Sequence, residues 1–501
     1  MSFRKYPRPR SRQISKACIE TLEARQLLSF SPTASFPVGR NPQDVVTADF
    51  NNDGKLDLAT TSYDDATGDG SVSVLLGNGS GSFQTARTFA TAPYTFALAT
   101  GDFNAEGKID LATANNGGVE NNDVSILLGK GDGTFAPAVG FGAPYAWSIT
   151  AGDVNADGKL DLVTTADDGW GFDAVSVLLG HGDGSFAAPI TYDSYYGQVF
   201  TPTLADFNGD GNVDVAVAGW QMYGAIVYLG NGDGTLQDPT FYENNTIAGS
   251  NSITAGDFNA DGKIDLVTSN YMTNSATVFL GSGDGSFIVP PRTSGAGNAP
   301  GSATTADVNA DGKLDLIVTN QSSAGGISVL LGDGLGGLAA PITAAGPASS
   351  LAIADFSGDG RPDAAATNLG SSSVAILLND GNWTVQPTRP QITISDVTKA
   401  EGKNKTTTSF TFTVSLSAAS NQPVTVSYRT ANGTATAGSD YTAKSGTITF
   451  APGETTKTIT IEVKGDNKRE SNETFYLDLF GLSSNALFTK NRGIGTILND
   501  D

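Results

Sequence analysis

Cysteine and histidine are almost absent from this sequence, and each absence excludes a class of site. Cys18 is the only cysteine among 501 residues, so no disulfide can form within the chain. His181 is the only histidine. Zinc sites and catalysis based on histidine are therefore not expected, because both draw on these two residue types. A metal site made of carboxylates remains compatible with the composition.

Basic residues and long hydrophobic runs are scarce too. The 29 Lys and Arg residues face 52 Asp and Glu residues, which gives a formal net charge of −23. Nucleic acids and anionic membranes attract proteins with a basic surface, so neither is expected as a partner. No segment reaches the roughly 20 apolar residues of a transmembrane helix, so no membrane span is expected. Cations are the natural partners of such a chain.

Helix signals are also lacking. No long stretch combines helical apolar periodicity with helix-forming residues, whereas glycine is abundant at 61 residues. This composition favours an all-β fold. The length would suffice for two to four ordinary domains, although a repeat fold often exceeds the usual domain size.

What the sequence does contain is one acidic motif in seven copies. DFNNDGKLDL begins at Asp49, and related stretches begin, 48 to 53 residues apart, at Asp102, Asp153, Asp206, Asp257, Asp307 and Asp355. Each copy is followed by a second signature, glycine-rich in most units, of which SVLLGNGSGSF from Ser73 is the first. The pattern predicts four strands per unit, with an acidic turn between the first two and a glycine turn between the last two.

Units of this size predict a β-propeller. Four strands in about 50 residues make one blade, and a single such sheet cannot cover its own apolar faces. Seven blades closed into a ring solve that problem. Residues 29–39 are similar to the fourth-strand segments of other units, so an N-terminal strand could complete the seventh blade, although WTVQP after Gly381 competes for that place.

The predicted organisation has three parts. Residues 1–29 form a basic leader without stable structure, residues 30–387 a seven-bladed β-propeller, and residues 388–501 an immunoglobulin-like β-sandwich. The seven units resemble FG-GAP/VCBS repeats, which form the propeller of integrin α subunits and of many bacterial surface proteins. That resemblance implies an extracellular or cell-surface location. LEARQLLS at residues 22–29 resembles the LEPR-XLL leader motif of large bacterial surface proteins, and a plain basic tail is the alternative.

The acidic turns have the oxygen spacing of a calcium site. Ca²⁺ prefers six to eight oxygen ligands, and a turn with oxygen side chains at positions 1, 3 and 5 and a backbone carbonyl at position 7 supplies them. An EF-hand needs Glu at position 12, where this chain has Thr60 and its counterparts, none of them acidic. Position 9 is Asp in every unit instead. The repeats therefore predict a nine-residue hairpin site like that of the integrin propeller.

The predicted calcium ligands follow this spacing in all seven units. They are Asp49, Asn51, Asp53, Asp57, Asp102, Asn104, Glu106, Asp110, Asp153, Asn155, Asp157, Asp161, Asp206, Asn208, Asp210, Asp214, Asp257, Asn259, Asp261, Asp265, Asp307, Asn309, Asp311, Asp315, Asp355, Ser357, Asp359 and Asp363. Glu106 lengthens one ligand and Ser357 offers a weaker oxygen, so the second and seventh sites are expected to be the weakest. The alternative is a metal-free Asx-turn, in which these side chains accept hydrogen bonds from their own backbone.

The repeats stop at the segment QPTRPQ, residues 386–391. The alternating strands beyond it predict a β-sandwich, and the run TANGTATAGSDYTAKSGTITFAPGETTKTITIEV closely resembles a Calx-β domain. In that family calcium lies at one tip of the sandwich. The matching residues are Glu401, Asp440, Asp466, Glu470, Asp500 and Asp501. Lys468 and Arg469 depart from the pattern of calcium sensors, so a stalk domain with a weak site or none is the alternative.

Aromatic residues gather on the face opposite the acidic turns. The position six residues before each turn, at the start of the first strand, holds Gln43, Phe96, Trp147, Phe200, Asn251, Gly301 and Ser349. Loops predicted on the same face add Tyr145, Trp170, Phe172, Tyr195, Tyr196, Trp220 and Tyr223. Aromatic side chains on loops suit sugar rings or a protein partner. The alternative is that they are wedges between blades.

Three functions are compatible with these patterns. A calcium-binding adhesion or ligand-binding protein without catalytic activity is the first, and its partner would be an unknown protein or glycan. A carbohydrate-binding lectin is the second. The third is a polysaccharide-lyase-type enzyme on a related propeller, although no pairing of a nucleophile with a base is visible.

Overall fold

The computed structural model describes residues 30–500, except 118–122, 168–172, 195–196, 221–223, 244–248, 323–324, 345–347, 382, 384–389, 418–419, 421–422 and 484–485. The chain divides into two compact units, one ending at Trp383 and the other beginning at Thr384. The predicted leader, residues 1–29, lies outside the described part. No helix in the described part is long and apolar enough to cross a membrane.

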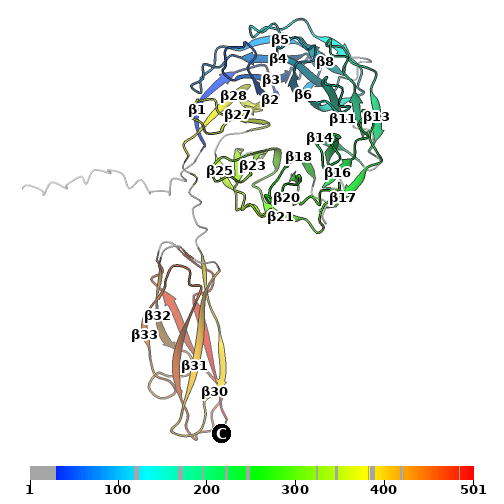
Figure 1. The fold of residues 1–501 in the computed structure, drawn as a ribbon. Helices are drawn as coiled ribbons and strands as arrows, with labels where there is room; N and C mark the ends of the chain where they lie inside the picture. Colours follow the sequence, from blue (N-terminus) through cyan, green and yellow to red (C-terminus); the bar gives the residue numbers. More distant parts are fainter. Residues whose placement is uncertain are drawn as a thin grey trace, which may run out of the picture. The chain divides into compact units, whose positions relative to one another are not determined.

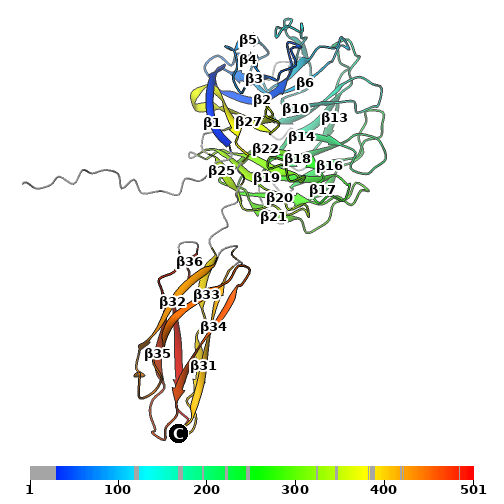
Figure 2. The ribbon, with the colours of Figure 1, turned by 60° about the vertical axis from the view of Figure 1, so that its left-hand side comes forward.

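Seven antiparallel four-stranded sheets form a ring in the first unit (Figures 1 and 2). Blade 1 contains β2 (Pro42–Ala48), β3 (Asp57–Tyr63), β4 (Gly70–Leu75) and β5 (Arg87–Ala90). Blade 2 contains β6 (Thr95–Gly101), β7 (Asp110–Asn115), β8 (Val124–Leu127) and β9 (Val139–Phe141). Blade 3 contains β10 (Ala146–Gly152), β11 (Asp161–Asp167), β12 (Asp173–Leu178) and β13 (Ile190–Asp193). Blade 4 contains β14 (Val199–Ala205), β15 (Asp214–Gly219), β16 (Ala225–Tyr228) and β17 (Thr240–Tyr242).

The remaining blades repeat this order. Blade 5 contains β18 (Ser250–Gly256), β19 (Asp265–Asn270), β20 (Ser275–Phe279) and β21 (Arg292–Gly295). Blade 6 contains β22 (Pro300–Ala306), β23 (Asp315–Asn320), β24 (Ile327–Leu330) and β25 (Ile342–Ala344). Blade 7 contains β26 (Leu351–Ala354), β27 (Asp363–Asn368), the 3-10 turn η1 (Leu369–Ser371), β28 (Ser373–Asn379) and β1 (Phe30–Pro37).

The ring closes through the N-terminal strand. β1 pairs antiparallel with β28, from Phe30 opposite Asn379 to Pro37 opposite Ser373, and so supplies the fourth strand of blade 7. Trp383, from the competing WTVQP segment, packs edge-on against Phe30 at 5.1 Å between ring centroids. The rest of that segment lies outside the described residues.

The second strand of each blade carries the core. β7, for example, is buried along its whole length, because sheet neighbours flank it and adjacent blades cover both its faces. At four blade junctions, an aromatic residue at position 2 of one acidic turn packs edge-on against the aromatic residue after the next blade's glycine turn. Phe50 and Phe135 lie 5.7 Å apart, as do Phe103 and Phe186. Aromatic rings prefer this arrangement over a face-to-face sandwich.

The second unit is a two-sheet sandwich. Its strands are β29 (Gln391–Ile394), β30 (Val397–Ala400), β31 (Thr407–Leu416), β32 (Val424–Asn432), β33 (Ser445–Phe450), β34 (Thr456–Lys464), β35 (Glu473–Phe480), β36 (Leu487–Phe488) and β37 (Arg492–Leu498). One sheet has the order β34-β31-β29-β36 and the other β30-β37-β35-β32-β33. Alternate residues of both sheets point inward around Phe410, Phe412 and Phe475. The predicted all-β fold, a propeller followed by an immunoglobulin-like sandwich, is confirmed.

Candidate metal centres

The seven acidic loops, positions 1 to 9 of each motif, share one backbone conformation. Position 6 is always glycine with φ between +78° and +87°, for example Gly54 and Gly211. Position 4 also has positive φ, as in Asn52 at +57°. Residues other than Gly and Asn seldom adopt this conformation, yet position 4 is Ala in four of the loops. Two left-handed residues in one loop turn the side chains at positions 1, 3 and 5 toward the inside of the turn.

Inside the loop these side chains accept hydrogen bonds from backbone N–H groups. In blade 1, Asp49 accepts from Asp53 N at 3.1 Å and from Gly54 N at 2.7 Å. Asn51 accepts from the same Asp53 N at 3.0 Å, and Asp53 accepts from Lys55 N at 2.9 Å. This is the geometry of the Asx-turn alternative. Each oxygen keeps a second lone pair, so the bonds leave capacity for a cation.

The Asp at position 9 has a different environment from the other three ligand positions. Its side chain is fully buried in all seven blades. Asp57 accepts from Phe50 N at 2.9 Å within its own loop and from Gly77 N at 2.7 Å in the glycine turn after the third strand. The same pair of bonds recurs in the other blades, with Asn379 N in place of the glycine N–H in blade 7. One carboxylate therefore joins the two turns of a blade.

Burial makes these inner carboxylates harder to ionise. Burial first, and then the charges of Asp49 and Asp53, raise the pKa of Asp57 to about 6. The pKa values of Asp110 and Asp315 rise to about 6 for the same reasons. Four backbone donors partly oppose the shift at Asp57 and Asp110, two for each carboxylate. A nearby cation would favour the ionised form of each group.

Blades 2 and 7 depart from this geometry, as their sequences do. Glu106 accepts from Asn104 Nδ2 at 3.1 Å and from Lys108 Nζ at 2.9 Å, contacts that other loops also make. Unlike Asp53 and its counterparts, however, it accepts no hydrogen bond from the backbone N–H at position 7. Ser357 Oγ donates to Asp355 at 3.3 Å, whereas the Asn in other loops accepts from the backbone. The ranking of these two sites as the weakest stays a prediction with a visible structural cause.

Six of the seven acidic loops are also held by the next blade. At six blade junctions the backbone carbonyl at position 2 accepts a hydrogen bond from the glycine turn of the following blade or from its substitute. Gly133 N donates to Phe50 O at 3.0 Å, and Gly81 N donates to Phe356 O at 2.7 Å, which closes the ring between blades 7 and 1. Between blades 6 and 7, the side chain of Asn379 donates to Val308 O at 2.8 Å in place of a glycine turn. The loops are therefore part of the blade interfaces.

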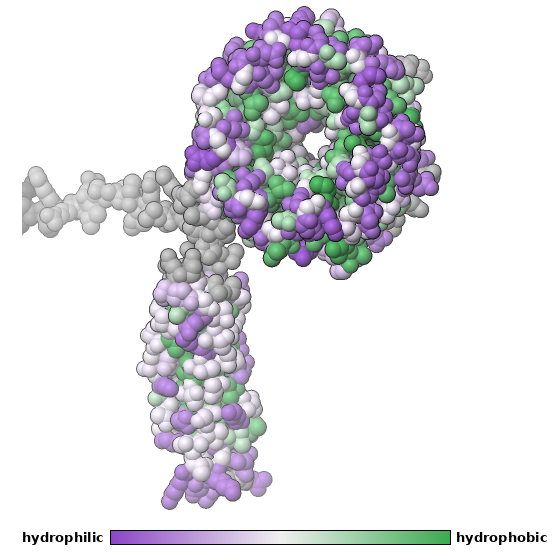
Figure 3. All heavy atoms as spheres, viewed as in Figure 1, coloured by the Kyte–Doolittle hydropathy of each residue, from purple (hydrophilic) through white to green (hydrophobic). Residues whose placement is uncertain are grey.

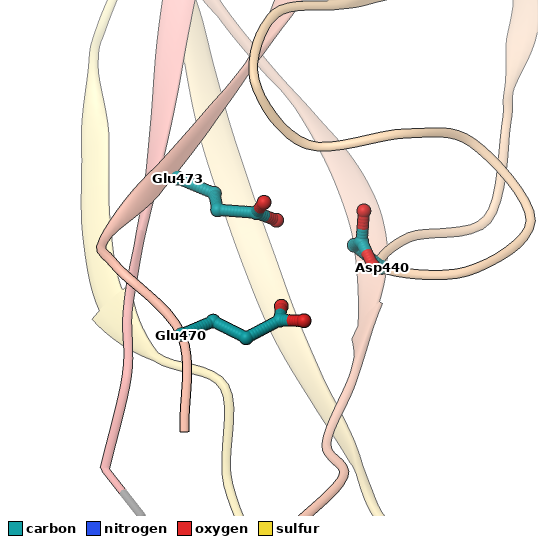
Figure 4. A group of neighbouring side chains, drawn as sticks. All are labelled: Asp440, Glu470 and Glu473. Atoms are coloured by element: carbon teal, nitrogen blue, oxygen red, sulfur yellow. The ribbon is translucent and has the colours of Figure 1, made fainter. Parts of the chain in front are cut away.

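A second acidic group lies at one tip of the sandwich. Asp440, Glu470 and Glu473 bring carboxylate oxygens within 4.8 Å of one another, and they are the one such group of three in the described part of the chain. Figure 4 shows the three carboxylates pointing into a common space: Glu473 from the start of β35, Glu470 from the segment before it, and Asp440 from the facing loop. Burial and the charges of Asp440, Glu470 and Glu401 raise the pKa of Glu473.

The other predicted tip ligands are engaged by neighbours. Asp466 accepts from Lys468 N at 2.7 Å, and Asp500 accepts from Gly402 N at 3.3 Å. Glu401 accepts from Asn499 Nδ2 at 3.2 Å. Asp501 lies outside the described residues. The structure thus brings Asp440 and Glu470 together with one unpredicted carboxylate.

Two families match the chain, and each covers one of the units described above. Residues 390–500 match the family described as Calx-beta domain. Residues 107–164, 206–268, 257–318 and 307–366 match FG-GAP-like repeat, and residues 41–75 match FG-GAP repeat. The chain combines FG-GAP repeats with a Calx-beta domain. The resemblance predicted from the sequence is confirmed in both units.

Similar proteins cover parts of the chain. Sodium/calcium exchanger 2 of Rattus norvegicus is 46% identical over 57 residues, which are 11% of this chain and 6% of the exchanger. The apo-form Calx CBD1 domain is 25% identical over 22% of this chain and 98% of that domain, with a TM-score of 0.20. An ancestral GH74 enzyme covers 91% of this chain and 62% of its own at 13% identity and a TM-score of 0.40. The chain thus spans a small fraction of the exchanger.

The donor atoms at both kinds of site fit calcium. Every side-chain ligand in the FG-GAP loops and at the Calx-beta tip is an oxygen, and a hard divalent cation prefers oxygen. At the tip, burial first and then the charges of neighbouring carboxylates raise the pKa of Glu473, and a nearby cation would favour its ionised form. Lys468 already pairs with Glu470 there and competes with a cation. Calx-beta domains bind calcium, and the tip of this one brings three carboxylates together.

The aromatic residues on the opposite face form a continuous arc. Trp147 stacks on Phe96 at 4.3 Å between centroids, with 20° between the ring planes. Phe200 contacts Trp147 at 6.2 Å on one side and Trp220 at 5.8 Å on the other. Tyr145, two residues before Trp147 in the sequence, is 38% exposed. Five of the predicted ligand-binding residues lie outside the described part, namely Trp170, Phe172, Tyr195, Tyr196 and Tyr223.

Sequence reasoning missed two sets of residues. Glu473 is the first residue of β35 and belongs to no calcium motif, although its position three residues after Glu470 is a local signal for it. Asn251 and Gln321, on the half of the ring without aromatics, also line the cavity at the start of the first strands. Isolated carboxamides give no sequence signal, because such residues are common on any polar surface.

Proposed function

We infer that this chain is a calcium-stabilised ligand-binding protein of the cell surface or the extracellular space, without catalytic activity of its own. The observation that carries the inference is the hydrogen bonding of six of the seven acidic loops to the next blade. A cation held in such a loop would stabilise a blade interface, and ligands that bind only the folded state raise its stability. Adhesion or ligand recognition would then use the aromatic arc at the other end of the first strands.

The arrangement of the ring supports this division of roles. Each first strand, such as β10, begins at the aromatic arc with Trp147 and ends next to its acidic loop at Asp153. Rigid strands therefore connect the metal loops to the recognition face without placing a metal in it. Binding sites on rigid elements are held more accurately than sites on free loops.

Incubation with polysaccharides and with protein arrays, in calcium and in EDTA, tests the proposal. We expect retention of a ligand in calcium, weaker retention in EDTA, and intact polysaccharide after incubation. Depolymerisation of any polysaccharide by the pure protein would contradict the absence of catalysis. Labelling of intact cells with a membrane-impermeant reagent tests the location, because an internal protein would stay unlabelled.

A further inference from the structure

The strand starts of the ring enclose a cavity of about 520 Å³, here called the axial mouth. Its lining includes Gln43, Phe96, Trp147, Phe200, Asn251 and Gln321. In the space-filling view, hydrophobic residues surround the central opening of the ring, with polar residues between them (Figure 3). The volume falls in the usual range for small-molecule sites, about 300 to 1,000 Å³.

One side of the axial mouth is an aromatic wall. Phe96 and Trp147 are half-buried, and Phe200 is 9% exposed behind them. Their mutual contacts fix the three rings across the junctions of blades 2, 3 and 4. A fixed apolar surface of this kind loses little conformational entropy when a ligand packs on it.

The other side presents carboxamides. Gly301 leaves room for Gln321, whose Nε2 would lie 2.4 Å from a Cβ at that position. Within the described residues, no side-chain hydrogen bond involves Gln321, Asn251 or the indole N–H of Trp147. The side-chain Nε2 of Gln43 donates a hydrogen bond to Asn41 O, and its side-chain oxygen remains available as an acceptor. Uncommitted donors and acceptors thus face an apolar wall across one cavity.

The charge of the mouth selects against ionic ligands. The described lining contains no Lys, Arg or His. Its one carboxylate, Asp44, already accepts hydrogen bonds from Val45 N at 2.9 Å, Leu98 N at 3.1 Å and Ser350 Oγ at 2.6 Å. The chain as a whole carries a formal charge of −23, which repels anions.

We propose that the axial mouth binds one ring of a neutral sugar, with an apolar ring face on Phe96 and Trp147 and hydroxyl groups on Asn251 and Gln321. This rests on the proposed recognition at the aromatic face and names its ligand class. A sugar ring carries an apolar C–H face and a rim of hydroxyls that both donate and accept, which matches the two sides of the mouth. A folded protein domain is too large for the cavity.

Calorimetric titration with neutral methyl glycosides tests the assignment. We expect one or more to bind in calcium, and the double variant Asn251→Ala/Gln321→Ala to bind at least about tenfold more weakly, since two hydrogen bonds are lost. Asn78→Ala/Gln84→Ala is the matched control, because these exposed residues lie beside the glycine turn of blade 1. Its affinity should equal that of the unmodified protein. Thermal melting in calcium should be unchanged in both variants.

Several results would overturn the assignment. They are no binding of any neutral glycoside, equal binding by the Asn251→Ala/Gln321→Ala variant, and tighter binding of sialic acid or of tetramethylammonium. The proposed function has a separate readout. Capture of a protein ligand at the aromatic face would support the ligand-binding function and contradict the assignment of a sugar. A melting temperature that does not change with calcium would contradict the stabilising role of calcium without affecting the proposed sugar site.

Discussion

At the scale of single residues, the buried Asp at position 9 connects the metal chemistry to the fold. Asp57 is at once a predicted calcium ligand and the acceptor that joins its loop to the Gly77 turn. A raised pKa in the folded state means that this state holds the proton more tightly than the unfolded chain does. The ionisation of Asp57 therefore costs stability progressively as pH rises from about 4 to about 6.

Calcium should offset that cost, which gives a pH-dependent prediction. Near pH 5 the position-9 carboxyl groups of blades 1, 2 and 6, with pKa values of about 6, are mostly protonated, and calcium must displace the protons. Near pH 7.5 they are ionised, so calcium binds without this competition. We expect the rise of Tm on adding calcium to be larger near pH 7.5. Calorimetric scans at both values, with magnesium as a control, measure it, and an equal rise would count against the loops as the binding sites.

The tip of the Calx-beta domain allows a paired test with opposite signs. Lys468→Ala releases Glu470 from its ion pair and should raise calcium affinity a few-fold, because exposed pairs contribute roughly 1 kcal/mol or less. Glu473→Gln removes a ligand charge and should lower the affinity about tenfold or more. Lys490→Ala is the control. Its ion-pair partner Asp396 lies before the start of β30, whereas the acidic tip lies beyond the end of that strand. Titration calorimetry that found both tip variants unchanged would place any calcium elsewhere.

At the scale of elements, the glycine turns and acidic loops act as one interlocking unit around the ring. At the junction between blades 6 and 7, a side chain replaces the glycine turn as the donor to the preceding acidic loop. Asn379 is 2% exposed there, and its amide donates to Val308 O and Pro362 O at 2.8 and 3.1 Å. Its carbonyl accepts from Trp383 Nε1 at 3.0 Å. One side chain replaces the glycine turn of the other junctions.

Asn379→Ala should therefore destabilise the propeller more than an exposed asparagine does. The substitution leaves two backbone carbonyls and an indole N–H without this partner, which costs about 2 to 3 kcal/mol. Chemical denaturation of the full chain measures the loss. Asn298→Ala, in the exposed segment before β22, should change stability by less than about 1 kcal/mol. Equal effects of the two substitutions would show that the junction does not depend on Asn379.

The sequence predicted the blades but not every contact between them. Two motifs in phase, such as those at Asp49 and Ser73, fix the strands, because turn residues and apolar runs are local signals. Asp57 accepts hydrogen bonds from N–H groups of two different turns. The spacing of residues in the sequence does not reveal which N–H groups come close to it in the fold. Glu473 joins Asp440 only through sandwich packing, for the same reason. The ring positions Phe96 and Trp147 were predicted from repeat phase, whereas their carboxamide counterparts carry no pattern.

At the scale of the whole molecule, ring closure depends on a strand from the other end of the repeat array. β1 lies more than 300 residues from its partner β28 in the sequence, and both segments that competed for its place had strand-like patterns. Pairing with β28 decides between them. Without β1, blade 7 would expose an unpaired edge along β28.

Deleting residues 1–37 should accordingly lower the Tm of the propeller and weaken its response to calcium. The loss of one blade edge opens the ring at the junction where Gly81 bonds to Phe356 O. Deleting residues 1–29 alone is the control, because β1 begins at Phe30 and stays intact. Differential scanning calorimetry compares the two forms. If the longer deletion melted like the shorter one, closure through β1 would not stabilise the ring.

Calcium-dependent melting of the full chain is the measurement that tests the central claim most directly. If cations occupy the acidic loops, each site contributes about 2.7 kcal/mol when calcium is at 100 times its Kd, and the propeller transition moves upward between EDTA and millimolar calcium. Glu106→Asp, which restores the common ligand in blade 2, should enlarge that shift. A propeller transition at the same temperature in EDTA and in calcium would contradict the claim and leave the seven loops as metal-free turns.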